Sequence, residues 1–237
     1  MDEVTLLEHL LKVYNLLLER YGPQHWWPGE TPFEVMVGAI LTQSAAWVNV
    51  EKAINNLKTA GALSPGAIRE MPHDKLANLI HASGYFNAKA RKLKAMVEWL
   101  GENFGDDPGC MSAWDTMELR KSLLAVHGIG EETADSIILY AAYKPIFVVD
   151  AYTRRILERL GICPLPHALT EKHSHSYATF QALFMDNLRL NTAMFNEYHA
   201  LFVRHGKETC RKAPLCPQCC LRSICPYPGV LGIHNDG

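Results

Sequence analysis

Apolar residues recur along most of this chain with the three- and four-residue spacing of amphipathic helices. The first such segment runs from Leu6 to Leu18, and a more uniformly apolar segment covers Phe33 to Gln43. The same spacing predicts further helices over residues 45–58, 74–82, 88–103, 117–126, 131–143, 151–160, 177–188 and 192–206. Only Ile146 to Val149 has the continuous apolar character of a β-strand, and one isolated run cannot form a sheet. The pattern therefore predicts an all-α fold.

Polar residues mark two of the predicted helix starts. Ser44 is expected to cap the helix that begins at Ala45, because a serine hydroxyl can accept a hydrogen bond from the first turn. Ser64 followed by Pro65 has the cap-then-proline pattern of another helix start.

The segment from Ala125 to Arg155 carries the most informative pattern. Gly128-Ile129-Gly130 stands directly before an apolar helix. Glycines at a helix N-terminus let backbone N–H groups approach an anion such as a phosphate closely. After that helix and the extended apolar run comes a single acid, Asp150. The segment therefore predicts a phosphodiester-binding turn and a carboxylate held at a fixed place beside it.

Five of the seven cysteines fall in the segment CRKAPLCPQCCLRSIC, which spans Cys210 to Cys225. Four of them have the spacing C-x5-C-x2-C-x5-C and are the candidate metal ligands: Cys210, Cys216, Cys219 and Cys225. Four thiolates can hold tetrahedral zinc or a [4Fe–4S] cluster, and the spacing alone does not decide between them. Cys220 is a rival for the third ligand position. Cys110 and Cys163 stand apart and are expected to be core thiols.

Composition and charge limit the class of protein. The chain has 237 residues, of which 48% are hydrophobic, and this excludes a disordered protein. No apolar run reaches membrane-spanning length, and the acidic N-terminus lacks the basic start of a signal peptide, so a cytoplasmic protein is expected. The net charge of −2 does not suggest nucleic acid. Two basic clusters, Lys89 to Lys94 and Arg204 to Lys212, are interpreted most simply as solvated helix faces.

The glycine turn, Asp150 and the cysteine loop together resemble the endonuclease III superfamily of DNA glycosylases. The resemblance covers most of the chain. It implies two helical lobes that flank a DNA-binding cleft: a helical barrel with the helix-hairpin-helix, residues 24–136, and a lobe made of residues 1–23 and 137–237. The family's cysteine loop, C-x6-C-x2-C-x5-C, is one residue longer in its first gap, and the resemblance favours a [4Fe–4S] cluster over zinc.

The resemblance also implies roles for single residues. Asp150 matches an essential catalytic aspartate, and Gly128 and Gly130 match the hairpin that grips the DNA backbone. Gln43, in LTQSAAW, matches a glutamine that enters the duplex, and Tyr85 matches a residue that wedges into DNA, although ordinary packing is an equally good interpretation of Tyr85. A further expected DNA contact, which comes from the sequence alone, is Arg154, which follows Asp150.

One position departs from the pattern of the bifunctional members. They carry a lysine two residues after the second hairpin glycine, and this chain has Glu132 there. A carboxylate cannot form a Schiff base, so the resemblance implies hydrolysis without strand cleavage. Alternatively, Glu132 serves only the helix dipole.

Several residues are candidates for the base-binding pocket. The order WWP…LTQ…W resembles the 3-methyladenine-excising branch of the superfamily. Aromatic faces stack on bases and attract cations. The expected pocket contains Trp26, Trp27, Pro28, Trp47 and Glu132, with Lys207 as a supporting residue.

The function expected from these features is removal of an alkylated, cationic purine from double-stranded DNA by a monomeric glycosylase without lyase activity. Three alternatives remain open. One is an endonuclease III-like glycosylase and abasic-site lyase that acts on oxidised pyrimidines. Another is a mismatch-specific adenine or uracil glycosylase, and the third is a non-catalytic iron–sulfur protein that binds DNA.

Overall fold

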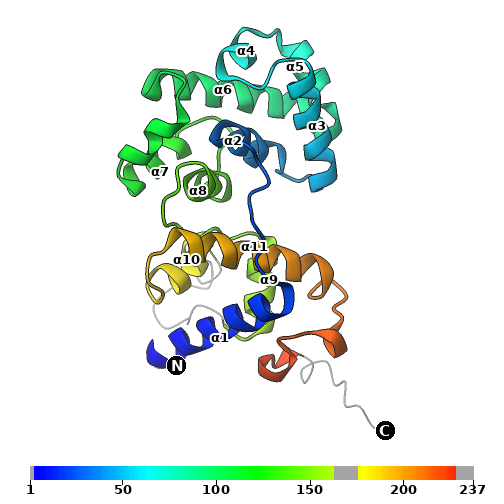
Figure 1. Ribbon diagram of the computed structural model, residues 1–237, viewed down its shortest axis with the longest axis vertical. Coiled ribbons are helices and arrows are strands. Elements are labelled where there is room, and N and C mark those ends of the chain that lie inside the picture. Colours follow the sequence, from blue (N-terminus) through cyan, green and yellow to red (C-terminus); the bar gives the residue numbers. More distant parts are fainter. Residues whose placement is uncertain (1–2, 163–175, 228–237) are drawn as a thin grey trace. The chain divides into compact units, whose positions relative to one another are not determined.

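The computed structural model describes residues 3–162 and 176–227, and every regular element in these ranges is a helix. The prediction of an all-α fold is confirmed. The chain divides into two compact units, which are described separately (Figure 1). Unit 1 comprises residues 1–26 and 147–237, and unit 2 comprises residues 27–146. The sequence placed these boundaries after residues 23 and 136. With the observed division, the whole helix that follows the glycine turn belongs to unit 2.

Unit 2 is built around α2 (Pro32–Leu41), whose residues from Phe33 to Leu41 are all buried. This burial follows from a sequence that is apolar on every face of the helix. Helix α2 packs against α3, α6 and α8 and against a 3₁₀ helix, Pro108–Ala113. The α-helices of unit 2 after α2 are α3 (Trp47–Thr59), α4 (Pro65–Glu70), α5 (His73–Leu79), α6 (Phe86–Phe104), α7 (Thr116–Leu124) and α8 (Glu131–Tyr140).

The helix starts of unit 2 confirm one predicted cap and contradict another. The Ser64 side chain accepts a hydrogen bond from the Ala67 N–H at 3.3 Å, as expected. Ser44 does not cap α3: its φ of 53° lies in the left-handed region, whereas an N-cap residue requires extended backbone. Ala46 has that backbone and occupies the cap position without a side-chain bond.

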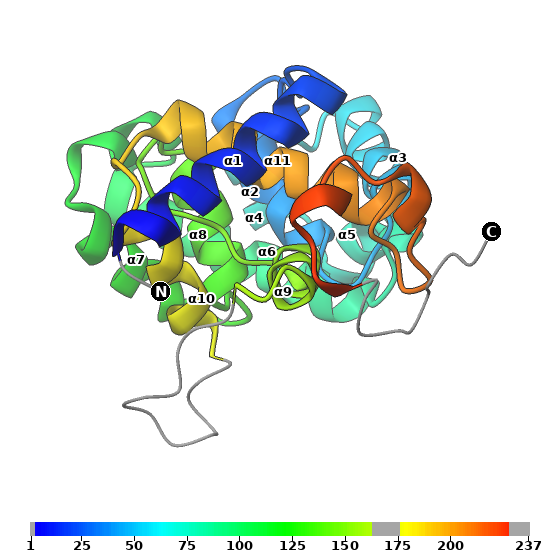
Figure 2. The same ribbon diagram turned by 90° about the horizontal axis from the view of Figure 1, so that it is seen from below.

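Unit 1 contains α1 (Glu3–Tyr21), α9 (Ala151–Arg159), α10 (Tyr177–Met185) and α11 (Thr192–Glu208). Helix α11 packs against both α1 and α9 (Figure 2). The buried Tyr198 of α11 fixes the contact with α1, because its hydroxyl donates to the Leu10 carbonyl at 2.9 Å. Two short 3₁₀ turns, Cys216–Gln218 and Arg222–Ile224, follow in the cysteine-rich segment.

The apolar run before Asp150 is extended but pairs with no strand in the described residues. Side chains of α10 satisfy its backbone instead: the Gln181 amide donates to the Phe147 carbonyl at 2.7 Å, and the Tyr177 hydroxyl accepts from the Val149 N–H at 3.2 Å. The Phe147 ring stacks on Phe184 with a centroid separation of 3.6 Å. The buried run therefore delivers Asp150 to a fixed position at the start of α9.

No helix in the described ranges combines the length and the apolar character that a membrane span requires.

Candidate functional site

The glycine turn before α8 has two glycines with different structural requirements. Gly128 has a φ of +83°, and a Cβ atom added there would collide with the Lys92 side chain. Gly130 has extended backbone and is the N-cap of α8, and an added Cβ atom would meet nothing within 4 Å. Between them, Ile129 is buried and anchors the turn. The protein's own packing thus explains glycine at position 128 but not at position 130.

Gln43 is tied to this turn by its side-chain amide. Its nitrogen donates to the Gly128 carbonyl at 3.1 Å and to the Thr133 hydroxyl at 3.0 Å. Its oxygen accepts from the Lys92 ammonium at 2.5 Å. The glutamine that the resemblance places in the DNA duplex is therefore held against the hairpin in the protein alone.

Lys89 departs from the expectation that the basic cluster on α6 is a solvated face. It is 1% exposed, and its ammonium donates to the carbonyls of Leu41 and Ser83 at 2.8 and 2.6 Å. Burial lowers the pKa of Lys89 to about 8, and the positive charge of Lys92 adds to that effect. The solvated-face interpretation is wrong for Lys89, because its side chain joins the end of α2 to the end of the 3₁₀ turn His81–Ser83.

Tyr85 lies two residues after Ser83. It is the N-cap of α6, has a φ of 45° and is 74% exposed. A tyrosine with left-handed backbone is uncommon, and its exposure means that core packing does not account for the ring. The side chain is accessible to a binding partner.

Glu132 belongs to a polar cavity in unit 2. The cavity measures about 230 Å³. It is lined by Ala39, Thr42, Gln43, Ser44, Glu132, Thr133 and Ser136. The Ser136 hydroxyl donates to the Glu132 carbonyl at 2.7 Å, so the hydroxyl is bonded to the helix backbone. The residue at the family's lysine position thus borders a space lined by hydrogen-bonding groups.

Two of the expected aromatic pocket residues, Trp27 and Trp47, are in contact within unit 2. The Trp27 ring lies 5.6 Å from Trp47 and 5.3 Å from Tyr140 between centroids, and it covers Gly38, where a Cβ atom would stand 3.2 Å from the indole. These three rings form an aromatic cluster in unit 2, next to the exposed Pro28. Tyr140 was not among the expected pocket residues.

Trp26 falls in unit 1, where the Lys207 ammonium lies 5.8 Å from the centroid of its ring. Desolvation lowers the pKa of Lys207, and the negative charge of Asp150 opposes this shift. Within unit 1, Trp26 thus contacts a lysine of α11.

Asp150 is the N-cap of α9 and is 9% exposed. Its Oδ1 accepts from the Thr153 N–H at 2.7 Å. Its Oδ2 lies 3.9 Å from Nε2 of the buried His199 on α11. Burial lowers the pKa of His199, although Asp150 favours its protonated form. One carboxylate oxygen is thus fixed by the helix start, and the other faces His199.

Close packing of α9 on α11 brings these residues together. A Cβ atom on Gly206 of α11 would collide with the Tyr152 ring of α9, so only glycine allows this approach. Arg155 strengthens the contact, since its guanidinium donates to the Gly206 carbonyl at 2.9 Å and stacks over Tyr152.

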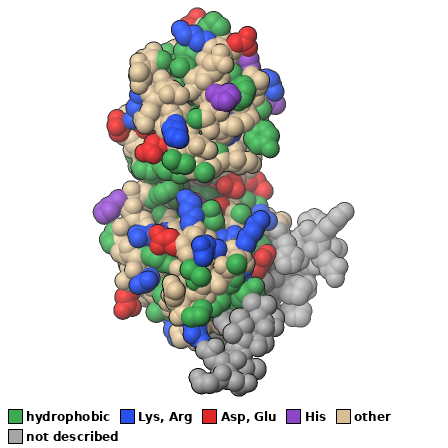
Figure 3. Space-filling model, turned by 90° about the vertical axis from the view of Figure 1, so that its right-hand side faces the viewer, with side chains coloured by type: hydrophobic (Ala, Val, Ile, Leu, Met, Phe, Trp, Pro, Cys, Tyr) green, Lys and Arg blue, Asp and Glu red, His purple; other side chains and the backbone are tan. Residues whose placement is uncertain are grey.

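Arg154, the expected DNA contact beside Asp150, lies with its guanidinium 5.6 Å from the centroid of the Phe180 ring. Lys and Arg side chains gather on the face of unit 1 that occupies the lower half of Figure 3. Such a surface can neutralise phosphates despite the small net charge of the chain.

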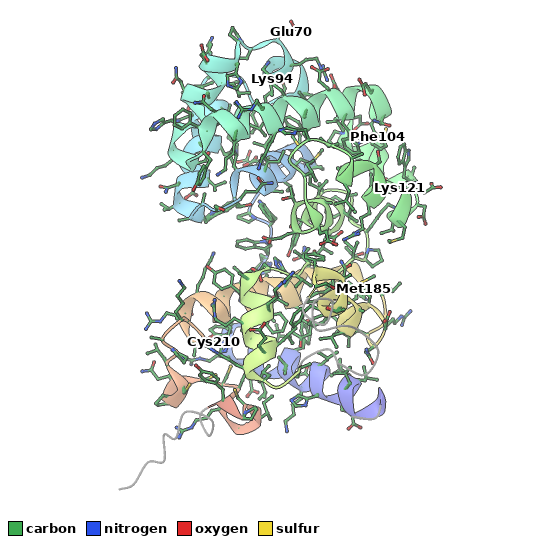
Figure 4. The ribbon with its side chains drawn as sticks, turned by 180° about the vertical axis from the view of Figure 1, so that it is seen from behind. Glu70, Lys94, Phe104, Lys121, Met185 and Cys210 are labelled. Carbon is green, nitrogen blue, oxygen red and sulfur yellow. The ribbon has the colours of Figure 1, made fainter. Side chains whose placement is uncertain are left out.

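The cysteine-rich segment forms one cavity at the end of α11 (Figure 4, where Cys210 is labelled). All four expected ligands line it, namely Cys210, Cys216, Cys219 and Cys225, and Cys220 is not among the lining residues. In the described ranges no group of three or more His, Cys, Asp or Glu side chains is arranged to hold a metal ion. The four thiols nevertheless line one cavity, and four cysteine thiolates are the ligand set of a [4Fe–4S] cluster.

Burial makes two of these thiols poor acids on their own. It raises the pKa of Cys219 to about 11 and also raises the pKa of Cys225. Bound iron would reverse this, because a coordinated thiol is deprotonated outright. Cys110, expected in the core, is exposed instead, and Cys163 lies outside the described residues.

Sequence analysis did not identify several residues that contact the expected site residues within each unit. They are His199, Gly206, Tyr140 and the second histidine of α11, His205. A glycine inside a helix is the one signal that could have indicated the α9–α11 contact.

A model of the HhH-GPD superfamily of base excision DNA repair proteins matches residues 37–177. The chain belongs to this superfamily, and the expectation of a DNA glycosylase fold is confirmed. The matched range includes the hairpin, α8 and Asp150.

Two individual relatives match most of the chain. A protein of Methanocaldococcus jannaschii named as a DNA repair glycosylase is 44% identical over 219 residues, which cover 92% of this chain and 96% of that protein. Endonuclease III of Sulfolobus acidocaldarius is 28% identical over 82% of each chain.

Solved structures share the fold. An endonuclease III–DNA complex superposes with a TM-score of 0.78 at 18% identity, covering 95% of this chain and 98% of that one. A Helicobacter pylori 3-methyladenine DNA glycosylase bound to 1,N6-ethenoadenine superposes with a TM-score of 0.65 at 27% identity, covering 88% and 98%.

Proposed function

We propose that this glycosylase removes alkylated, cationic purines from double-stranded DNA and leaves an intact abasic site. The observation that carries the proposal is Glu132, which stands in the first turn of α8 and borders the polar cavity. An acid at this position cannot act as the amine nucleophile of a bifunctional enzyme. Its negative charge favours a base that carries delocalised positive charge.

The aromatic cluster supports the same substrate class. Indole faces attract cations, and the rings of Trp27 and Trp47 are in mutual contact. The H. pylori relative is a 3-methyladenine glycosylase whose structure contains a modified adenine. Alkylated purines are also good leaving groups, so modest catalysis suffices for them.

The proposed chemistry depends on Asp150. As the N-glycosidic bond breaks, its electron pair leaves with the base, and positive charge develops on the deoxyribose. The carboxylate stabilises that charge, in parallel with glycosidase chemistry. Water then forms the new bond to C1′ and gives up a proton, while the cationic purine departs as a neutral base. The Thr153 N–H and the start of α9 stabilise negative charge on the carboxylate throughout.

Other residues bind the DNA in this proposal. The backbone at Gly128 and Gly130 grips a phosphate, and Arg154 contacts the strand. Gln43 and Tyr85 fill the gap that the flipped base leaves, because flipping unstacks the duplex. Gln43 must first release its bonds to the hairpin. We expect the protein to act as a monomer in the cytoplasm, in association with the nucleoid.

We also propose that Cys210, Cys216, Cys219 and Cys225 bind a [4Fe–4S] cluster. The cluster would cross-link the loop that follows α11, and it takes no part in the hydrolytic step. Anaerobically purified protein should contain about four irons per chain. Cys225→Ser should lose the cluster and Cys220→Ser should retain it. Stoichiometric zinc without iron would exclude this cofactor.

The substrate proposal is tested by single-turnover base release from a panel of duplexes at equal enzyme concentration. We expect 3-methyladenine to be released faster than thymine glycol or uracil. Faster release of either neutral base would refute the cationic preference and leave the family assignment intact. Borohydride should trap no covalent complex.

A second candidate is a glycosylase with lyase activity, like the endonuclease III relatives. Lys207 favours it, because desolvation lowers the pKa of its amine and Asp150 is close enough to oppose that shift. A covalent complex that borohydride traps with the wild type but not with Lys207→Gln would establish this candidate.

A further inference from the structure

We propose that His205 and Arg159 donate hydrogen bonds to two of the cysteine sulfurs and so set the reduction potential of the cluster. The inference rests on the proposed [4Fe–4S] cluster. It assigns both side chains as positioning residues that act through Cys219 and Cys210.

His205 reaches the cysteine cavity from α11. Its ring is 1% exposed, and Nε2 lies 3.6 Å from the Cys219 sulfur. On the other side of the ring, Nδ1 lies 2.9 Å from the Tyr21 hydroxyl, which is also 2.9 Å from the Thr209 hydroxyl. The imidazole is thus held between a hydroxyl pair and a sulfur.

The chemistry of a bound cysteine fixes the direction of the contact. A sulfur bound to iron carries no proton and can only accept, so Nε2 must be the donor. In the neutral ring Nδ1 then accepts from the Tyr21 hydroxyl. Tyr21 therefore selects the tautomer that presents N–H to Cys219, as outer partners of metal-site groups commonly do.

Arg159 makes the second contact from the last turn of α9. Its Nη1 lies 3.2 Å from the Cys210 sulfur. The same guanidinium donates to the carbonyls of Arg211 at 2.7 Å and Lys212 at 3.1 Å, and it stacks over the Tyr227 ring at 4.6 Å. These contacts hold a positive charge and an N–H group against the sulfur.

Both contacts stabilise the same oxidation state. Adding one electron to the cluster increases the negative charge on its sulfurs, and N–H donors stabilise that charge. Hydrogen bonds to the sulfurs are a recognised determinant of iron–sulfur potentials. The two donors therefore raise the reduction potential, and removing either should lower it.

The test is the one-electron midpoint potential of the reconstituted full-length protein, measured by protein film voltammetry without DNA. We expect His205→Leu and Arg159→Met to shift the potential to more negative values while iron and sulfide contents stay at the wild-type level. The shift should be larger for Arg159→Met, which also removes a charge. His205→Gln, which can keep a donor, should recover part of the loss.

A matched control is Arg189→Met, which removes the same charge from an exposed position of unit 1. It should leave the potential unchanged. Unchanged potentials in both His205→Leu and Arg159→Met, with full clusters, would overturn the tuning proposal while leaving the cluster in place. Wild-type protein without iron would instead refute the cluster itself.

The wild type alone provides a second measurement if the variants lose their clusters. N–H···S bonds shift the Fe–S(Cys) stretching bands when the exchangeable hydrogens are replaced by deuterium. Resonance Raman spectra in H₂O and D₂O should therefore differ in these bands. Identical spectra after full exchange would contradict the proposal, whatever the variants do.

Discussion

Helices α8 and α9 both begin at residues proposed to act on DNA, but they begin in opposite ways. The first position of α8 is preceded by Gly130, which has no side chain and makes no capping bond. The start of α9 is capped by Asp150, which accepts from the Thr153 N–H. The same structural element thus presents bare backbone in one unit and a fixed carboxylate in the other.

The difference separates two uses of a helix N-terminus. Unpaired N–H groups at a helix start attract an external anion, which suits a grip on phosphate. Once a side chain has taken these groups, the helix start instead orients that side chain. Two acidic residues of α8, Glu131 and Asp135, form ion pairs with Arg120. The Arg120 side chain lies 2.7 Å from Asp135 and 3.4 Å from Glu131.

The largest expected effect tests the role of Asp150, which caps the start of α9. Asp150→Asn keeps an oxygen that can accept from Thr153 but removes the negative charge opposite the developing cation. Single-turnover base release should fall by about 100- to 1,000-fold, as for loss of one preorganised electrostatic group. Binding of undamaged duplex, measured by fluorescence anisotropy, should persist.

The control for this variant is Asp115→Asn. Asp115 caps α7 by accepting from the Met117 and Glu118 N–H groups, so the same change is made at another helix start. It should leave base release within a few-fold of the wild type. If Asp150→Asn were equally active, Asp150 would be a cap and nothing more.

Sequence periodicity predicted the helices well because the spacing of apolar residues is local information. Polar residues predicted one cap correctly and misplaced the other, since the left-handed backbone at Ser44 depends on the turn in which it lies. Asp150 and Gly128 were found because their motif spans a short stretch of chain. At each of these two positions, the local backbone geometry requires the residue type that is found there.

The remaining site residues depend on contacts between distant segments. His199 reaches Asp150 only because Gly206 lets α11 approach α9. Lys89 stands in a basic run that is typical of a solvated face, and its partners are backbone carbonyls at the ends of two other helical segments. Carbonyl groups have no sequence signature, so its burial could not be predicted.

The titration of Lys89 tests whether this lysine supports the start of α8, which has no side-chain cap. It bonds the end of α2, from which the chain leads to Gln43 and its bonds with the α8 hairpin. The folded-state pKa of Lys89, about 8, lies below its ordinary value of 10.5. The unfolded chain therefore binds more protons between these values, and stability should rise with pH across this window.

The measurement is the free energy of unfolding in urea at two pH values. This lysine should add about 2 kcal/mol between about pH 7.5 and 9.5, because one pKa unit corresponds to about 1.4 kcal/mol. Lys89→Met should lose that pH-dependent increment. Lys52→Met, at an exposed lysine of α3, should retain it. Equal slopes in all three proteins would show that Lys89 does not titrate in this window.

Adding one methyl group at each of the two hairpin glycines tests the start of α8 more closely. Gly128→Ala should destabilise the fold by about 1–2 kcal/mol through left-handed backbone strain, with a further cost from displacing Lys92. Gly130→Ala should change the free energy of unfolding by less than about 0.5 kcal/mol, as at an ordinary surface position. It should nevertheless weaken duplex binding, because its methyl group would stand against the phosphate. Unaltered affinity in Gly130→Ala would argue against a backbone grip at this helix start.

The smallest expected effect concerns the adjacent tryptophans, which extend the comparison because they fall in different units. Trp27→Phe keeps an aromatic face beside Trp47 and Tyr140 but weakens its attraction for a cation, a difference of about 1 kcal/mol. The ratio of 3-methyladenine to uracil release should fall several-fold. Trp26→Phe is the matched control: it changes the ring over Lys207 and should leave that ratio nearly constant. If Trp26→Phe alone altered the ratio, the base would be selected by the neighbourhood of Lys207 in unit 1 rather than by the aromatic cluster of unit 2.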